Sequence, residues 1–219
     1  MTRMTTRPTR RFDYETSGSA IYTESFRRIR QGADLSAFTS EQAQVAVRMI
    51  HAAGDLDLPR HIVFHPELVT AARTALRAGA PIFVDAHMID SGITRRRLPA
   101  DNEVRCLLRD DRAAELAAEW GTTRSAAAVS LWGQDLAGAV VAIGNAPTAL
   151  FHLLEIIADG GPRPAAVIGV PVGFVGSAES KQALADSDLG VPWLVVHGHR
   201  GGSAMAASAV NALASESEL

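Results

Sequence analysis

The sequence AVVAIGNAPTALFHLL, residues 139–154, contains the signals of a strand, a tight turn and a helix in direct succession. Residues 139–143 form a continuous apolar run rich in β-branched side chains, and Gly144-Asn145 is a turn signal. Pro147 suits the first turn of a helix, because the N–H group that proline lacks would have no partner there. A helix that begins at the carboxyl end of a buried strand presents free backbone N–H groups and the positive end of its dipole. We therefore expect this turn to accept the carboxylates or phosphates of a ligand.

Short apolar runs alternate with helical patterns along the rest of the chain. The predicted strands are residues 61–64, 81–84, 104–108, 139–143, 165–170 and 193–196. This alternation predicts a single three-layer α/β domain with a mostly parallel, doubly wound sheet flanked by helices. We expect the domain to span residues 13–214, between a flexible N-terminal tail (1–12) and a C-terminal tail (215–219). The polar and glycine-rich strand ends then gather along one edge of the sheet, where ligands bind in this architecture.

Composition narrows the class of protein. The 219 residues carry a formal net charge of −3, which argues against nucleic-acid binding through bulk positive charge. Cys106 is the only cysteine, so no intramolecular disulfide is possible, and its apolar surroundings indicate core filling. No stretch approaches the ~18 apolar residues of a membrane span, and no apolar segment of a signal peptide follows the basic N-terminus. We expect a cytoplasmic protein that binds neither nucleic acid nor membranes.

His51 is the candidate acid. It falls in the last turn of a helix that begins near Thr39 and stops at Gly54. Unpaired carbonyls and the negative end of the dipole favour the imidazolium form there, so we expect a pKa above the reference of ~6.5. A helix-capping or core histidine is the alternative. Ser25 faces inward on a helix over residues 19–30, and by spacing alone it is a small filler that bonds to the preceding turn.

Several other polar residues are candidates for anion or metal binding. Thr94 precedes three consecutive arginines that begin at Arg95, a run that is either solvated surface or a site for several carboxylates. Arg124 lies in the first turn of a helix, where a cation opposes the dipole, and this indicates a bound anion or a nearby Asp. His197 and His199 have no evident third ligand, so we predict no metal site.

Common catalytic motifs are absent from the sequence. It contains no G-x-G-x-x-G, no G-x-x-x-x-G-K-[ST] and no G-x-S-x-G pattern, which weakens the nucleotide-dependent and acyl-transfer readings. What remains is one well-placed histidine with several arginines and many backbone donors. These groups suit an isomerisation that needs a proton and a rigidly held substrate.

Eight segments spread over nearly the whole chain carry a family resemblance. They are AIYTESFRRIR (20–30), VRMIHAAGD (47–55), GAPIFVDAHMI (79–89), GITRRRLPADNEV (92–104), TRSAAA (123–128), AIGNAPTAL (142–150), GVPVGFVGSAESK (169–181) and HRGGSAMAASAVNAL (199–213). In these segments the chain resembles the precorrin-8X methylmutases, the isomerases of cobalamin biosynthesis. The resemblance implies that a methyl group migrates between adjacent ring carbons of a tetrapyrrole to give hydrogenobyrinate, without a cofactor.

The resemblance also implies roles for individual residues. His51 matches the family's acid, which protonates a ring nitrogen and lets the methyl shift proceed. The residues implied to bind the polyanionic substrate are Ser25, Thr94, Arg95, Arg124, Asn145, Gly173, Gly202 and Ser203. Asn145 and the loops of Gly173 and Gly202 would do so as backbone donors. His87 stands where an acidic or small residue is expected, so the contacts near Asp85 are open.

The oligomeric state and the exact substrate are also matters of expectation. The resemblance implies a homodimer with its sites near the subunit boundary, and a product that can be handed to the next pathway enzyme. The residues do not decide between metal-free precorrin-8X and cobalt-precorrin-8 of the anaerobic route. A non-catalytic corrinoid carrier would use the same arginines without any chemistry.

Overall fold

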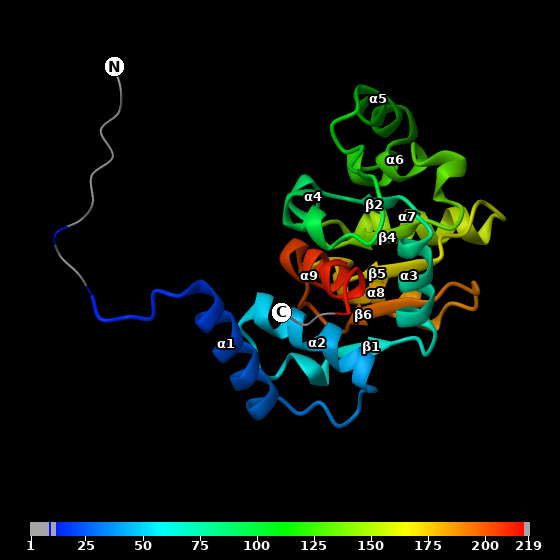
Figure 1. The fold of residues 1–219 in the computed structure, drawn as a ribbon. Coiled ribbons are helices and arrows are strands. Elements are labelled where there is room, and N and C mark those ends of the chain that lie inside the picture. Colours follow the sequence, from blue (N-terminus) through cyan, green and yellow to red (C-terminus); the bar gives the residue numbers. More distant parts are fainter. Residues whose placement is uncertain (1–8, 10–11, 217–219) are drawn as a thin grey trace, which may run out of the picture.

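The computed structural model describes Thr9 and residues 12–216, so the predicted tails lie largely outside the described residues. Within these residues, one six-stranded sheet has the strand order β1-β6-β5-β4-β2-β3 (Figure 1). The strands are β1 (Ile62–Phe64), β2 (Ile82–Val84), β3 (Val104–Arg105), β4 (Val140–Ile143), β5 (Ala166–Gly169) and β6 (Trp193–Val196). Neighbouring strands pair in parallel, except that β1 is antiparallel to β6. The predicted single α/β domain with a mostly parallel sheet is confirmed.

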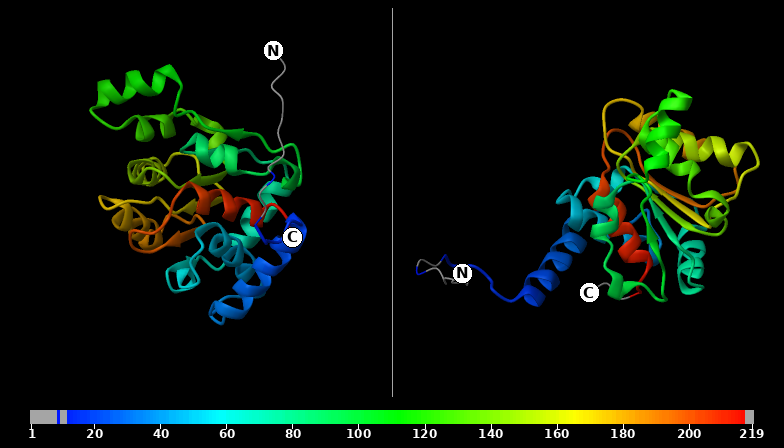
Figure 2. Two further views of the ribbon diagram at one scale, coloured as in Figure 1. Left: turned by 90° about the vertical axis from the view of Figure 1, so that its left-hand side faces the viewer. Right: turned by 90° about the horizontal axis from the view of Figure 1, so that it is seen from above.

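Helices cover both faces of the sheet, which Figure 2 shows between two helical layers. One layer contains α2 (Ser40–Ala53), α3 (Leu68–Arg77), α4 (His87–Gly92) and α9 (Ser203–Leu213). The other contains α6 (Arg124–Ser130), α7 (Pro147–Ala158) and α8 (Ser177–Asp186). At the periphery, α1 (Gly18–Gly32) packs on α2 and α5 (Asp111–Trp120) packs on α6. Short 3-10 turns are η1 (Leu58–Arg60), η2 (Arg95–Arg97) and η3 (Gly133–Leu136). Among the described residues, no helix has both the length and the apolar character that crossing a bilayer requires.

The position of β4 near the middle of the sheet explains why its sequence is continuously apolar. Val140 and Ala142 point into the core beneath α2 and α9, whereas Val141 and Ile143 point into the core beneath α6 and α7. All four side chains are fully buried. A strand covered on both faces cannot alternate between apolar and polar residues, and for this reason the run reads as uniformly hydrophobic.

The turn after β4 is closed by a carboxylate from the neighbouring strand. Asp85 directly follows β2, and its buried carboxylate accepts hydrogen bonds from the backbone N–H groups of Gly144, Asn145 and Ala146, at 2.6–3.3 Å. Burial raises the pKa of Asp85, and the three N–H donors oppose this effect. The expectation that this turn offers free N–H groups to a ligand is therefore wrong. The protein supplies its own anion to the start of α7.

This arrangement predicts a large stability loss for Asp85→Asn. An amide oxygen accepts fewer hydrogen bonds than a carboxylate, and the amide N–H₂ would oppose the remaining donors. We expect the free energy of unfolding to fall by about 2 kcal/mol or more, measured by chemical denaturation. Asp90→Asn is the control, because it removes only the exposed pair with Arg95 and should cost under ~1 kcal/mol. Equal losses in the two variants would contradict the structural role of Asp85.

Candidate active site

His51 lies in the last turn of α2, where sequence and structure both place it. The helix begins with a capping box between Thr39 and Gln42, and ends at Gly54 in the left-handed conformation. Ser25 projects from α1, and its hydroxyl lies 2.9 Å from Nδ1 of His51. The serine therefore does not bond to the preceding turn of its own helix. It is the hydrogen-bond partner of the candidate acid.

Two aromatic rings and a buried cation surround this histidine. The rings of Tyr22 and Phe26 stack on each other, and their centroids lie 5.0 and 5.1 Å from that of His51. The guanidinium of Arg48 lies over both rings, and its Nη1 donates to the tyrosine hydroxyl at 3.2 Å. Sequence reasoning missed Arg48. Its position three residues before His51, on the same helix face, was the available signal.

A cavity of about 400 Å³ opens beside this cluster. Its lining residues come from α1, α2 and the segment after α4, and they are Gly18, Ser19, Tyr22, Thr23, Arg48, Thr94, Arg96 and Arg97. The backbone N–H of Thr94 and Nε of Arg97 both donate to Asn211 near the end of α9. Three guanidinium groups thus converge on one cavity, which gives it a local positive potential in a chain of negative net charge.

The electrostatic surroundings lower the proton affinity of His51. Burial lowers its pKa below the usual 6.5, and the nearby charge of Arg48 lowers it further. The expectation of a raised pKa at the helix end is therefore wrong. The partly buried ring loses solvation, and a cation one turn away opposes a second positive charge.

Two other predicted contacts, Arg95 and Arg124, do not line this cavity. Thr94 lines the cavity, but the neighbouring Arg95 turns back to pair with Asp90 and to donate to the carbonyl of Ile93. Arg124 is exposed at the first turn of α6, and among the described residues no Asp or Glu pairs with it. The nearby Asp that would explain this cation is therefore not found there.

The remaining predicted contacts gather at the carboxyl edge of the sheet. The N–H of Gly202 donates to the carbonyl of Val170 at 2.8 Å, and that of Gly173 points to the carbonyl of His199 at 3.4 Å. As at Asn145, these two N–H groups already have acceptors in the protein, and substrate binding by other backbone donors of the two loops stays a prediction. Ser203 is the first residue of α9, whose N-cap is Gly202 without a side-chain cap. Side-chain contacts of Asn145 and Ser203 with a substrate stay predictions.

The histidines left open by the sequence have individual surroundings. Nε2 of His87 is buried, and within the described residues it has no hydrogen-bond partner. Nδ1 of His199 lies 3.0 Å from the carbonyl of Gly173. His197 lines a hollow beside α8. None of the three contacts the cluster around His51 through an observed hydrogen bond.

The environment of His51 predicts its titration. We expect an NMR titration midpoint below 6.5 in the free protein, and a higher midpoint in Arg48→Gln, because removing the cation makes the imidazolium less unfavourable. Arg28→Gln removes a cation that pairs with Glu24 on the exposed side of α1, and should leave the midpoint unchanged. A midpoint above 6.5 in the wild type, or no difference between the two variants, would contradict this description.

Comparison with known proteins agrees with the fold and identifies the family. The family model of precorrin-8X methylmutase matches residues 20–216. Precorrin-8X methylmutases from a Sinorhizobium species and from Pseudomonas aeruginosa are 60% and 52% identical to this chain, over 93% and 94% of its length and 97% and 99% of theirs. A crystal structure of precorrin-8X methylmutase from Thermus thermophilus superimposes with a TM-score of 0.80 at 41% identity, covering 89% of this chain and 96% of that one. The chain therefore belongs to the precorrin-8X methylmutase family, isomerases that catalyse methyl migration in precorrin-8X.

Proposed function

We propose that this methylmutase converts metal-free precorrin-8X into hydrogenobyrinate, with His51 as the proton donor. The observation that carries the proposal is the histidine held by Ser25 beneath two aromatic rings, beside a cavity lined by three arginines. A positioned acid contributes about 10²–10⁴-fold to a rate. Rigid holding of the macrocycle supplies the further acceleration.

The contact with Ser25 defines which nitrogen of His51 serves the substrate. Because the serine hydroxyl engages Nδ1, Nε2 is the nitrogen left to transfer a proton. The hydroxyl also fixes the orientation of the ring. In this proposal Ser25 positions the acid, in addition to any contact that it makes with substrate. Protonation of a ring nitrogen withdraws electrons from the macrocycle and favours the methyl shift.

The arginines and the acid act together in this proposal. Acetate and propionate arms make the substrate a polyanion, and Arg48, Arg96 and Arg97 are the cations that line the cavity. A carboxylate that settles beside Arg48 offsets the charge that lowers the pKa of His51, and so favours the imidazolium once substrate is bound. Arg95 and Arg124 lie outside the cavity lining and would meet other arms of the macrocycle.

The choice of the metal-free ring rests on the relatives. The two at 60% and 52% identity are both named for precorrin-8X, without cobalt. The homodimer also belongs to this proposal, and the exposed side chains of Phe12, Tyr14 and Ile21 at and before α1 support it, because they offer apolar surface to a second copy. Hand-over of product and a cytoplasmic location stay predictions.

The role of His51 predicts a separation of binding from turnover. His51→Ala should lower turnover at least ~100-fold while an absorption titration still shows substrate binding, because the arginine-lined cavity is unchanged. His65→Ala is the control, since this histidine lies between β1 and α3 and should leave turnover intact. Full turnover by His51→Ala would refute the acid. A wild type that binds but never rearranges the ring would instead indicate a carrier.

The proposed substrate predicts a preference between two rings. We expect purified protein to rearrange metal-free precorrin-8X faster than cobalt-precorrin-8, followed by the change in visible absorption as the conjugation extends. Equal concentrations of the two substrates, with the same enzyme preparation, make the comparison direct. Faster turnover of the cobalt form would assign the chain to the anaerobic route and leave the role of His51 open to its own test.

A further inference from the structure

Lys181 is the only lysine of this protein. The other basic residues are 20 arginines and seven histidines, so every other side chain that is fully charged at neutral pH is a guanidinium. The lysine lies on α8 with no exposed surface, and burial lowers its pKa to about 8. Burying an ammonium group is unfavourable unless it meets partners, and a methionine would fill similar space without that cost. We therefore expect the amine to make a contact that justifies burying a lysine here.

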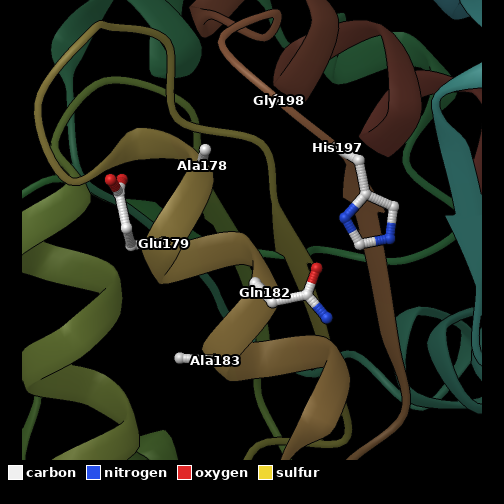
Figure 3. Close-up of a pocket in the computed structure, with 6 residues that line it drawn as sticks. All are labelled: Ala178, Glu179, Gln182, Ala183, His197 and Gly198. Carbon is white, nitrogen blue, oxygen red and sulfur yellow. The ribbon is translucent and has the colours of Figure 1, made fainter.

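The amine holds one loop at the carboxyl edge of the sheet. Nζ of Lys181 donates to the carbonyl of Arg200 at 2.6 Å. The loop of Arg200 in turn lies against the loop after β5, because the N–H of Gly202 donates to Val170 and a Cβ at Gly201 would lie 2.3 Å from the same carbonyl oxygen. From the same face of α8, the buried Ser177 hydroxyl donates to the carbonyl of Pro171 at 2.7 Å. The start of α8 thus fastens both loops. Figure 3 shows α8 beside the strand end at His197, where this loop begins.

The side chain of Arg200 continues the connection toward α2. Its Nε lies 3.2 Å from Oδ2 of Asp55, and its Nη1 donates to Nε2 of His61. Oδ1 of Asp55 accepts the N–H of Asp57 at 2.9 Å, so the carboxylate is held from two sides. Asp55 directly follows Gly54, the residue that ends α2. The connection therefore reaches the chain four residues beyond His51.

We propose that Lys181 is a positioning residue for the methyl shift, which holds Arg200 on Asp55 and thereby fixes the helix end that carries His51. This inference rests on the proposed role of His51. The amine itself touches neither the histidine nor the arginine-lined cavity. Its long, unbranched stem lets a buried cation reach a backbone carbonyl, whereas the planar, larger guanidinium of an arginine would not fit the same contact.

The first test compares Lys181→Met with Leu184→Ala. Both side chains are buried on α8, but the leucine packs in the apolar core and cannot hydrogen-bond to Arg200, so its variant reports the effect of loosening the helix alone. We expect kcat of Lys181→Met to fall between about tenfold and a hundredfold with little change in KM, because a small displacement of an acid costs that much. Circular dichroism at the assay temperature verifies that each variant is folded. Equal kcat values in the two variants would overturn the proposal.

The second test changes Asp55 and Arg200, which lie nearer the surface, so that no fully buried side chain is replaced. Asp55→Asn and Arg200→Gln each break the contact between these side chains, and Arg200→Gln leaves its backbone carbonyl for Lys181. We expect both to reproduce the loss in kcat, and Lys181→Met combined with Asp55→Asn to lose no more than either alone. Multiplied losses, or unchanged kcat in Asp55→Asn and Arg200→Gln, would overturn the proposal.

A spectroscopic readout separates this inference from the proposed acid. The imidazole signal of His51 should shift in Lys181→Met and in Asp55→Asn, and stay in place in Leu184→Ala, in protein without substrate. If His51→Ala retains turnover, the acid role fails whatever the NMR spectra show. If His51→Ala is inactive, but the His51 signal does not shift in Lys181→Met or Asp55→Asn, the positioning role alone fails.

Discussion

The buried carboxylate of Asp85 is the constraint on which the arrangement of the sheet depends. It joins the end of β2 to the turn after β4, and three N–H groups at the start of α7 bind it. This contact fixes the register of two neighbouring strands where their loops diverge. It also fills the anion site that a helix start at a strand end would otherwise present. Three arginines line the cavity beside the His51 cluster, and in the proposed function these side chains bind the carboxylates of the substrate.

In the free protein, His51 binds a proton less readily than a histidine in water does. Burial and the charge of Arg48 make its imidazolium less stable than in water. A group of lowered pKa gives up its proton readily, but it carries that proton in a smaller fraction of molecules at neutral pH. In the proposed function, the charge of a polyanionic substrate offsets that of the arginine and reverses part of this effect. Substrate binding is in this proposal linked to proton donation by His51 through the charge of Arg48.

The glycines and polar residues at the carboxyl edge of the sheet hold its loops together. Backbone contacts join the loops after β5 and β6, and the serine and lysine of α8 fasten them from below. Through Arg200 this edge reaches Asp55, which directly follows the C-cap of α2. A series of contacts thus connects the loops at this edge to the helix that carries His51. In the proposed positioning role, Lys181 supports this connection by donating to the carbonyl of Arg200.

The sequence by itself determined the strands, the helix that carries His51 and the inward face of Ser25, because these depend on hydrophobic spacing and capping within short segments. The family motifs determined the type of reaction for the same reason, since each motif is local. Only the tertiary structure decided that Asp85 occupies the turn at Gly144, that Ser25 bonds to His51, and that Arg48 lowers its pKa. These contacts join residues from different elements or depend on burial. Spacing along the chain does not encode which distant groups meet, or how much solvent they lose when they do.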